Sequence, residues 1–416
     1  MSTNMLAGKR ICIAHPAVIH LDHRLSKTVK SLLSAEVDVT IVCSAEMNTE
    51  QSEYESLVHV KKIASQDANL IQPSNHKIWL MRVLYNLCIY QPIRNLQKRK
   101  KSQRDPFKSF GQMICQEEFD VVHFINYPLS NELIYLRKKS SVPIIYESYE
   151  NWPEVFKDGQ VAMSTAESEK WLLLEQLAVK KSNACIVVGE QIAKVYHEYN
   201  KKISYPVIHN VAPSKPLAPS PLNTPISFYY QGYFRRGQGI ENALLAFALC
   251  KGEFTVTLQG SFLDAEYELE LHNKIRELGL SKKVTFLPKC NYSDVVKAAN
   301  VHDIGFLTPP LLTNGLVDKN SEVALPNKLF VYASGGLAMV FGKQQKAIRE
   351  ILEKTPSAFF VDTESTKDIQ KCFQALINNP QTVRNMKQSS AAWAQQYSPE
   401  AESMKVIDVY CKLLMK

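Results

Sequence analysis

The sequence predicts an α/β protein with two parallel-sheet halves that face each other across a cleft. Three observations lead to this fold class. Short β-rich runs alternate with helical patterns, a proline-rich segment interrupts them near the middle, and the same alternation then begins again. Parallel βαβ units produce such an alternation. The 416 residues are also enough for two separate cores.

The first half is predicted over residues 1–205. Its β-rich runs lie in "KRICIAHP", residues 37–43, "FDVVHFINYP", "VPIIYESYE" and "NACIVVGEQ", with helical patterns such as "LSKTVKSLL" between them. This order indicates a Rossmann-like domain.

Residues 206–225 form the predicted linker, because dense proline disfavours both helix and central strand. Its prolines are Pro206, Pro213, Pro216, Pro219, Pro221 and Pro225. A second Rossmann-like domain is expected over residues 226–395, with β-rich runs in "ISFYYQGYF", "FTVTLQGS", "KVTFLPKC", "HDIGFLTPP", "LAMVFGK" and "AFFVDTE". A helix is predicted over residues 396–416. Ligands of such sheets bind beyond the carboxyl ends of the strands, so the site should face the cleft.

Composition narrows the class of protein. The chain is 45% hydrophobic and 22% charged, which is ordinary for a soluble globular protein. It has no apolar run of transmembrane length and no signal-peptide core at its start, and its nine cysteines include no CxxC pair. We therefore expect a cytoplasmic protein. The net charge of +8 favours acidic partners, which leaves nucleic acid, phosphate-bearing substrates and an anionic membrane open.

The segment "FYYQGYFRRGQGIENALLAF" reads as a strand, a glycine-rich turn and a helix that begins near Ile240. Gly232 and Gly237 permit tight turns and close backbone approach, and Arg235 and Arg236 add positive charge. A turn that leads into a helix N-terminus favours phosphate. The alternative is a solvated loop whose arginines face water.

The segment "LPNKLFVYASGG" predicts a second helix start of the same kind. Proline is tolerated in the first turn of a helix and glycine commonly follows its end, so Lys328 should lie near the positive end of a short helix. A surface lysine is the alternative. Because both segments follow strands of one sheet, both helix starts can point into one cleft, where two positive ends would suit a diphosphate.

Other chemistries have little support in the sequence. It contains no Asp-x-Asp pair, and its ten histidines show no HxH or HExxH spacing, so no metal or other cofactor is expected. No GxSxG elbow is present for a serine hydrolase. Nucleic-acid binding is not expected either, because the basic segments carry few aromatic residues and no known binding module.

Residues 76–108 are basic and amphipathic. Apolar residues alternate there with nine lysines and arginines, among them Lys98, Arg99, Lys100 and Lys101. Such a segment suits the headgroup layer of an anionic membrane, so we expect peripheral association with the inner face of a membrane. A core-packed helix followed by a solvated basic loop is the alternative.

The order of several motifs resembles the GT-B glycosyltransferases of family 4, which are retaining enzymes with nucleotide-sugar donors. The resemblance covers nearly the whole chain and rests on "HPAVIHLDHRLSKTVKSLL", "IIYESYENWPE", "NACIVVGEQIAKVYHEY", "YQGYFRRGQGIENALLAF" and "ALPNKLFVYASGGLAMV". It implies the GT-B fold, with a C-terminal helix that crosses back to the first domain. It also implies an acceptor-binding first half and a donor-binding second half.

Site roles follow from the resemblance. It implies catalytic roles for Lys328, Arg236 and Glu150. It assigns donor binding to Gly232, Arg235, Arg236, Gly237, Glu322, Asn327 and Lys328. It places Asp22, Arg24, Asn126 and Tyr149 in the acceptor site or cleft.

The sequence departs from the family at four positions. Val331 and Val323 stand where the family has its paired glutamates, although Glu322 is adjacent to Val323. Tyr149 and Ile125 stand where the family has histidines. These departures predict either an unusual donor or a subunit that keeps the fold without turnover.

The function expected from the resemblance is hexosyl transfer. The sugar would pass, with retention and without metal, from a nucleotide-sugar to a lipid-linked acceptor in the biosynthesis of a surface polysaccharide such as lipopolysaccharide. A non-catalytic GT-B subunit that binds a nucleotide or a partner enzyme is the main alternative. A nucleotide-sugar epimerase is a third possibility.

Overall fold

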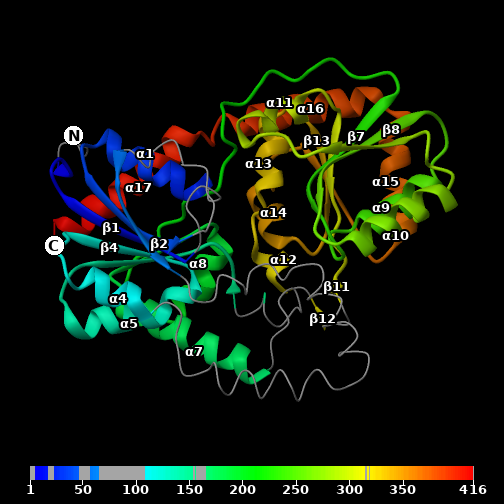
Figure 1. The fold of residues 1–416 in the computed structure, drawn as a ribbon. Helices are drawn as coiled ribbons and strands as arrows, with labels where there is room; N and C mark the ends of the chain where they lie inside the picture. The colour runs from blue at the N-terminus through cyan, green and yellow to red at the C-terminus, as the bar shows by residue number, and fades with distance from the viewer. Residues whose placement is uncertain are drawn as a thin grey trace.

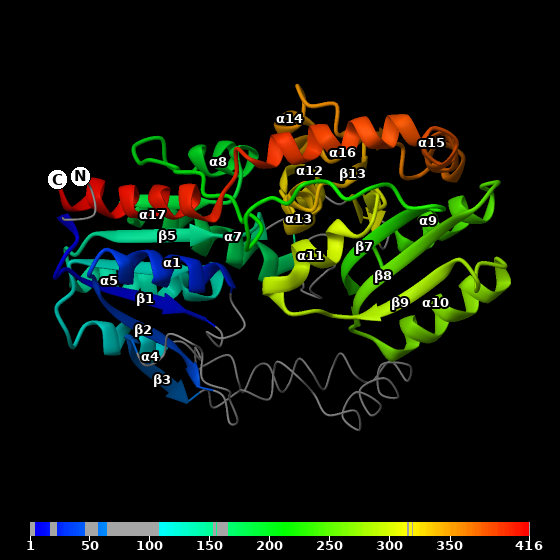
Figure 2. The ribbon, with the colours of Figure 1, turned by 90° about the horizontal axis from the view of Figure 1, so that it is seen from above.

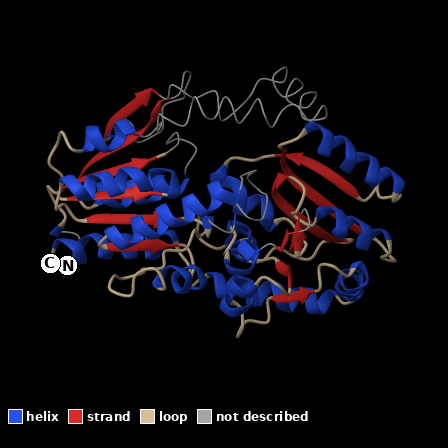
Figure 3. Cartoon of the chain, turned by 90° about the horizontal axis from the view of Figure 1, so that it is seen from below, coloured by secondary structure: helices blue, strands red, loops and turns tan. Residues whose placement is uncertain are grey.

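A computed structural model describes residues 5–16, 23–45, 57–64, 108–152, 155, 165–313, 316–317 and 319–415. These residues form two parallel-sheet halves that lie side by side, each with helices on both faces of its sheet (Figure 1, Figure 3). The α/β fold class predicted from the sequence is confirmed.

The first half contains a six-stranded sheet in the order β3-β2-β1-β4-β5-β6, and all its strand pairs are parallel. Its elements are β1 (Arg10–His15), α1 (His23–Ser34), β2 (Asp38–Ala45), β3 (His59–Ala64), α4 (Lys108–Ile114), β4 (Val121–Ile125), η5 (Tyr127–Leu129), α5 (Ser130–Lys139), β5 (Ile144–Ser148), α7 (Thr165–Lys181), β6 (Ala184–Val187) and α8 (Glu190–His197).

The second half repeats this topology. Its parallel sheet has the order β9-β8-β7-β10-β13-β14, so the strand order of both halves is 3-2-1-4-5-6, the Rossmann order. Its elements are β7 (Ile226–Phe234), α9 (Ile240–Ala248), β8 (Phe254–Phe262), α10 (Ala265–Glu277), β9 (Val284–Pro288), η6 (Tyr292–Asp294), α11 (Val295–Asn300), β10 (Ile304–Leu307), β11 (Leu312–Thr313), β12 (Leu316–Val317), α12 (Lys319–Val323), α13 (Asn327–Ser334), β13 (Ala338–Gly342), α14 (Lys346–Ile351), β14 (Ala358–Val361), α15 (Thr366–Asn378) and α16 (Pro380–Ala394).

The last helix, α17 (Pro399–Leu414), returns to the first half, as expected. Ser398 caps its N-terminus by accepting a hydrogen bond from the Ala401 amide (3.0 Å), and Pro399 occupies its first turn. Its apolar face, which includes Ile407 and Tyr410, enters the core on the α1 face of the first sheet. Figure 2 shows α17 alongside α1, so the two ends of the described chain share one core.

The two halves are also bridged by polar contacts. Lys27 of α1 donates to the Tyr292 hydroxyl (3.3 Å), and Lys194 of α8 lies 3.7 Å from the Glu350 carboxylate on α14. Gly189, before α8, permits close approach to Leu325, because a Cβ there would lie 3.2 Å from the leucine side chain. The halves therefore meet around the carboxyl ends of their strands.

Candidate functional site

A cavity of about 580 Å³ lies between the two halves. Its wall on the side of the first half includes Tyr149, Glu150 and Trp152, just beyond β5, together with Val155, Val188 and Asn210. Its wall in the second half comes from the end of β7 and the turn before α9, from the end of β10, and from the segment between α12 and α13. The cavity thus occupies the place where parallel sheets of this order bind ligands.

Arg235 and Lys328 both line the second-half wall of this cavity. Lys328 is the second residue of α13, and its Nζ lies 5.1 Å from the centre of the Tyr230 ring, within range of a cation–π interaction. Burial, and to a lesser degree the nearby Arg235 guanidinium, lowers the pKa of Lys328 to about 8. At neutral pH most Lys328 side chains are still protonated, and this part of the wall is cationic.

Gly232 makes room for the lysine. A Cβ at Gly232 would lie 3.0 Å from both Cε and Nζ of Lys328, and the φ of 132° also favours glycine. Gly237 (φ 82°) and Gly239 (φ 80°) shape the following turn, and α9 begins at Ile240, as the sequence predicts. The structure therefore brings the two predicted helix starts to one cavity, through Gln238 before α9 and Asn327 of α13.

Glu150 faces this wall from the first half. Its Oε2 accepts a hydrogen bond from Nδ2 of Asn320 (3.2 Å), which joins the two walls of the cavity. Asn126 lies behind Tyr149 and Trp152, and its Oδ1 accepts hydrogen bonds from the Tyr149 amide and from Trp152 Nε1, both 3.1 Å long. Asn126 therefore holds the turn in place and is not among the residues that line the cavity.

The structure separates the two neighbouring arginines. Arg236 is exposed and pairs with Glu270 of α10, with its guanidinium 5.2 Å from the Tyr267 ring centre. It is absent from the cavity wall, whereas Arg235 is half-buried there. Glu322 is also outside the wall, as are Gly232 and Gly237, and it pairs with Lys346 of α14.

Arg24 is buried within the first half. Its side chain is 6% exposed, its Nε and Nη2 lie 2.6 and 2.5 Å from Oε1 of Glu147, and Nη1 donates to the Ile208 carbonyl (2.8 Å). Glu147 in turn lies 3.0 Å from His123, whose other ring nitrogen contacts the Tyr410 hydroxyl at 2.7 Å. Arg24 thus belongs to a buried network that ties α1 and α17 to β5. Asp22 and residues 98–101, which carry the predicted membrane contact, lie outside the described residues.

The sequence reasoning missed several lining residues. Trp152, Asn210, Tyr233, Gln238, Asn320 and Gln345 all line the cavity and had no predicted role. Some of them could have been predicted as polar residues that follow a strand of the sheet, since Gln238 follows β7 and Gln345 follows β13. Val331, where a family glutamate was expected, is 4% exposed in the core of the second half.

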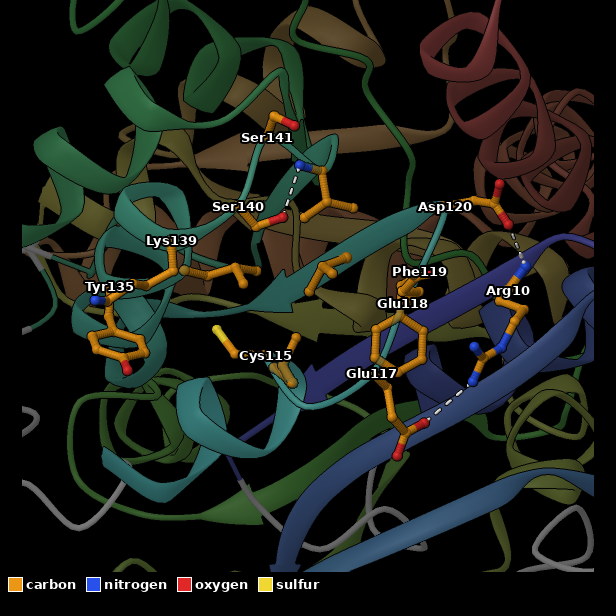
Figure 4. A pocket seen from close by; sticks show the side chains of 14 residues that line it. Arg10, Cys115, Glu117, Glu118, Phe119, Asp120, Tyr135, Lys139, Ser140 and Ser141 are labelled. Atoms are coloured by element: carbon orange, nitrogen blue, oxygen red, sulfur yellow. Dashed lines mark hydrogen bonds and ion pairs between the residues drawn. The ribbon is translucent and has the colours of Figure 1, made fainter.

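A larger hollow, of about 910 Å³, lies in the first half near Asp120 and Val142 (Figure 4). These residues precede β4 and β5, so the hollow is at the amino ends of the strands, away from the position where such sheets bind ligands. Two of its carboxylates are already engaged. Glu117 pairs with Arg10 (3.3 Å), and Asp120 pairs with Lys9 (3.1 Å). We therefore place the functional site in the smaller, interdomain cavity.

Two kinds of feature are absent from the described residues. No cluster of three His, Cys, Asp or Glu side chains there could hold a metal ion. None of the helices described combines the length and the apolar character needed to cross a bilayer.

Comparison with known proteins identifies the fold. No family model and no curated protein matches the sequence. Among solved structures, sucrose-phosphate synthase from Thermosynechococcus elongatus aligns with a TM-score of 0.72 at 14% identity, covering 98% of this chain and 99% of that one. Anabaena HepE, solved in complex with UDP and glucose, aligns with a TM-score of 0.63 at 14% identity over 96% and 99% of the two chains. The lipopolysaccharide outer core galactosyltransferase WaaB gives 0.55 at 14% identity over 97% of each. The protein has the GT-B fold, as the resemblance implied.

Proposed function

We propose that the protein is a glycosyltransferase that moves a sugar from a nucleoside-diphosphate sugar to a lipid-linked acceptor of a surface polysaccharide. One observation carries the proposal: Arg235 and Lys328 meet on one wall of the interdomain cavity, where α9 and α13 also begin. Helix N-termini and fixed cations together favour a diphosphate.

The same wall suits the chemistry of sugar transfer. When the bond between the anomeric carbon and the diphosphate oxygen breaks, the departing nucleoside diphosphate takes the electron pair and gains negative charge. The acceptor oxygen forms the new bond to the anomeric carbon, and its proton passes to the diphosphate oxygen that has just left. Preorganised cations at the place where charge develops accelerate such a step. Arg235 and Lys328 would do this from the donor side, and Glu150 would face the reacting sugar from the acceptor side.

The comparisons support the proposed substrate class. HepE binds UDP and glucose, and WaaB is named as a galactosyltransferase of the lipopolysaccharide outer core. The lipid-linked acceptor, transfer with retention, independence of metal, and a cytoplasmic place at the inner face of the membrane are parts of our proposal. The basic segment over residues 76–108 supports the membrane part through its charge alone.

A second function is favoured by the missing carboxylates. The two positions of the family's paired acids are Val323 and Val331, and the adjacent Glu322 pairs with Lys346, so none of these residues presents a carboxylate to the cavity. A subunit that binds nucleotide without turnover is consistent with this arrangement.

Calorimetry with UDP, GDP and ADP, followed by transfer assays from the sugar nucleotides of the preferred base, tests both functions. Selective binding together with transfer in EDTA would support the proposed enzyme. Binding without transfer to any acceptor would favour the subunit. Absence of binding by all three nucleotides would refute the donor site.

A further inference from the structure

The turn that carries Glu150 is connected by hydrogen bonds to a buried carboxyl group on helix α7. Glu175 of α7 is 1% exposed and lies against β5 on the face that carries Tyr146 and Ser148. The opposite face of β5 carries Glu147 with its partners Arg24 and His123. Each face of the strand that leads to the site therefore has a buried carboxylate.

Glu175 is linked to Glu150 through hydroxyl groups. Its Oε1 accepts hydrogen bonds from the hydroxyls of Tyr146 (2.9 Å) and Tyr196, and Ser148 Oγ lies 3.5 Å away. Ser148 Oγ donates to the Glu150 carbonyl at 2.8 Å, and the Tyr196 hydroxyl lies 3.3 Å from the same oxygen. The backbone of Glu150 is thus one hydroxyl away from the Glu175 carboxyl group.

The number of hydroxyl protons limits which of these hydrogen bonds can form together. Ser148 and Tyr196 lie 2.8 Å apart, and each hydroxyl has one proton to donate. An ionised Glu175 is the stronger acceptor and holds the hydrogen bond that Tyr196 donates, which leaves Ser148 to donate to the Glu150 carbonyl. A neutral Glu175 accepts more weakly and carries a proton of its own, so Tyr196 can donate to the Glu150 carbonyl instead and compete with Ser148 for that oxygen.

We propose that Glu175 is a positioning residue of the interdomain cavity, which sets the place of Glu150 through Ser148 and Tyr196. This proposal rests on the proposed function, because it assigns Glu150 to the reaction.

Among the groups of this network, Glu175 is the one that titrates near neutral pH. Burial raises the pKa of Glu175 to about 7, against the opposing effect of the three hydroxyl hydrogen bonds. Burial, reinforced by the Glu175 charge, raises the pKa values of Tyr146 on β5, Cys185 on β6 and Tyr196 on α8, so all three remain neutral. Two other charged groups nearby have partners of their own. Glu147, on the opposite face of β5, pairs with Arg24 and His123. Glu132 of the neighbouring α5 accepts a hydrogen bond from the Gly111 amide.

The central test compares Glu175→Gln with the wild type and with Glu132→Gln. Glu132 is the matched control, since it is also buried in the first half but bonds the Gly111 amide (3.0 Å). We expect the wild-type kcat to rise through about pH 7 as Glu175 ionises, and Glu132→Gln to keep this step. Glu175→Gln should lose it, with kcat lowered roughly tenfold at pH 8 and the donor KM within about twofold of the wild type. A wild-type pH step in Glu175→Gln would overturn the proposal.

Ser148→Ala tests the link while the carboxylate stays in place. It should lower kcat at pH 8 by roughly the same factor with an unchanged donor KM, since the hydrogen bond to the Glu150 carbonyl is lost while Tyr146 and Tyr196 still donate to the Glu175 carboxylate. An unchanged kcat would overturn the proposal even if Glu175→Gln failed to fold.

Amide hydrogen exchange at residues 149–152 gives a readout that does not require transfer. After correction for intrinsic exchange, protection of this turn should increase above pH 7 in the wild type and not in Ser148→Ala. An inactive wild type that showed this difference would refute the proposed function and leave the positioning by Glu175 supported. Equal protection in both proteins would refute the positioning itself.

Discussion

Replacing Arg235 and Arg236 one at a time by alanine tests the donor site most directly. The two side chains are adjacent in sequence and carry the same charge, but only Arg235 lines the cavity, whereas Arg236 pairs with Glu270. A hydrogen bond between a guanidinium and a phosphate contributes about 1.5–3 kcal/mol. Arg235→Ala should therefore weaken UDP binding roughly 10- to 150-fold, and Arg236→Ala should change it by less than about twofold, as expected for an exposed charge screened by salt.

The assay is isothermal titration calorimetry at pH 7.0 and physiological salt. At this pH most Lys328 side chains are protonated, given a pKa of about 8, so the comparison measures Arg235 itself. Removal of Arg235 also relieves the repulsion that lowers the Lys328 pKa, an effect that would grow above pH 8. Equal losses in the two variants would mean that the arginines act through a shared long-range field, and would refute a direct contact from Arg235.

Three further predictions concern other parts of the molecule. Lys328→Ala should lower kcat by roughly two orders of magnitude. The UDP affinity of the wild type should fall as the pH rises through about 8, because Lys328 loses its charge there. Calorimetry across pH 6–9 measures this fall in affinity. Glu147→Gln removes the charge of the buried carboxylate that pairs with Arg24 and should lower the free energy of unfolding in urea by about 3–5 kcal/mol, whereas Glu117→Gln, in a partly exposed pair, should cost less than about 1 kcal/mol. Neutralising residues 98–101 should weaken binding to anionic vesicles at least about 100-fold, at about 1 kcal/mol per charge.

Each of these has an outcome that would contradict it. If UDP affinity does not change with pH in the wild type and is the same in Lys328→Ala, Lys328 does not contact the phosphates. Lys346→Ala is the control, because it alters a lysine that pairs with Glu322. Similar urea stability of the two glutamine variants would mean that Arg24 finds another partner. Unchanged vesicle binding by the neutralised protein would refute the membrane contact.

The fold was accessible from sequence because its signals are local. Buried strands such as "RICIAH" and "VVHFI" read as mostly apolar runs, and the last helix, predicted over residues 396–416, begins at Pro399. The meeting of Arg235 and Lys328 was also predictable, because both follow strands of one sheet and the carboxyl ends of parallel strands share an edge.

The direction of individual side chains was not accessible. Nothing local to "FRRGQG" indicates that the first arginine turns to the cavity and the second to Glu270, 34 residues away. Arg24 reaches Glu147 across 123 positions, and the hydroxyl network of Glu175 joins β5, α7 and α8. Such contacts arise from tertiary packing and leave no periodicity in the sequence.

The return of α17 to the first half has a consequence for biosynthesis. Tyr410 completes the core around α1 and contacts His123, 287 positions earlier, although the last strand of that sheet ends at Val187. At about 5–20 residues per second, a ribosome needs roughly 10–40 s to add the 200 or so residues between them. During that interval the nascent first half exposes the apolar surface that α17 later covers. The core of the first half is therefore completed only after the second half has been synthesised, and loss of α17 would destabilise the domain that was made first.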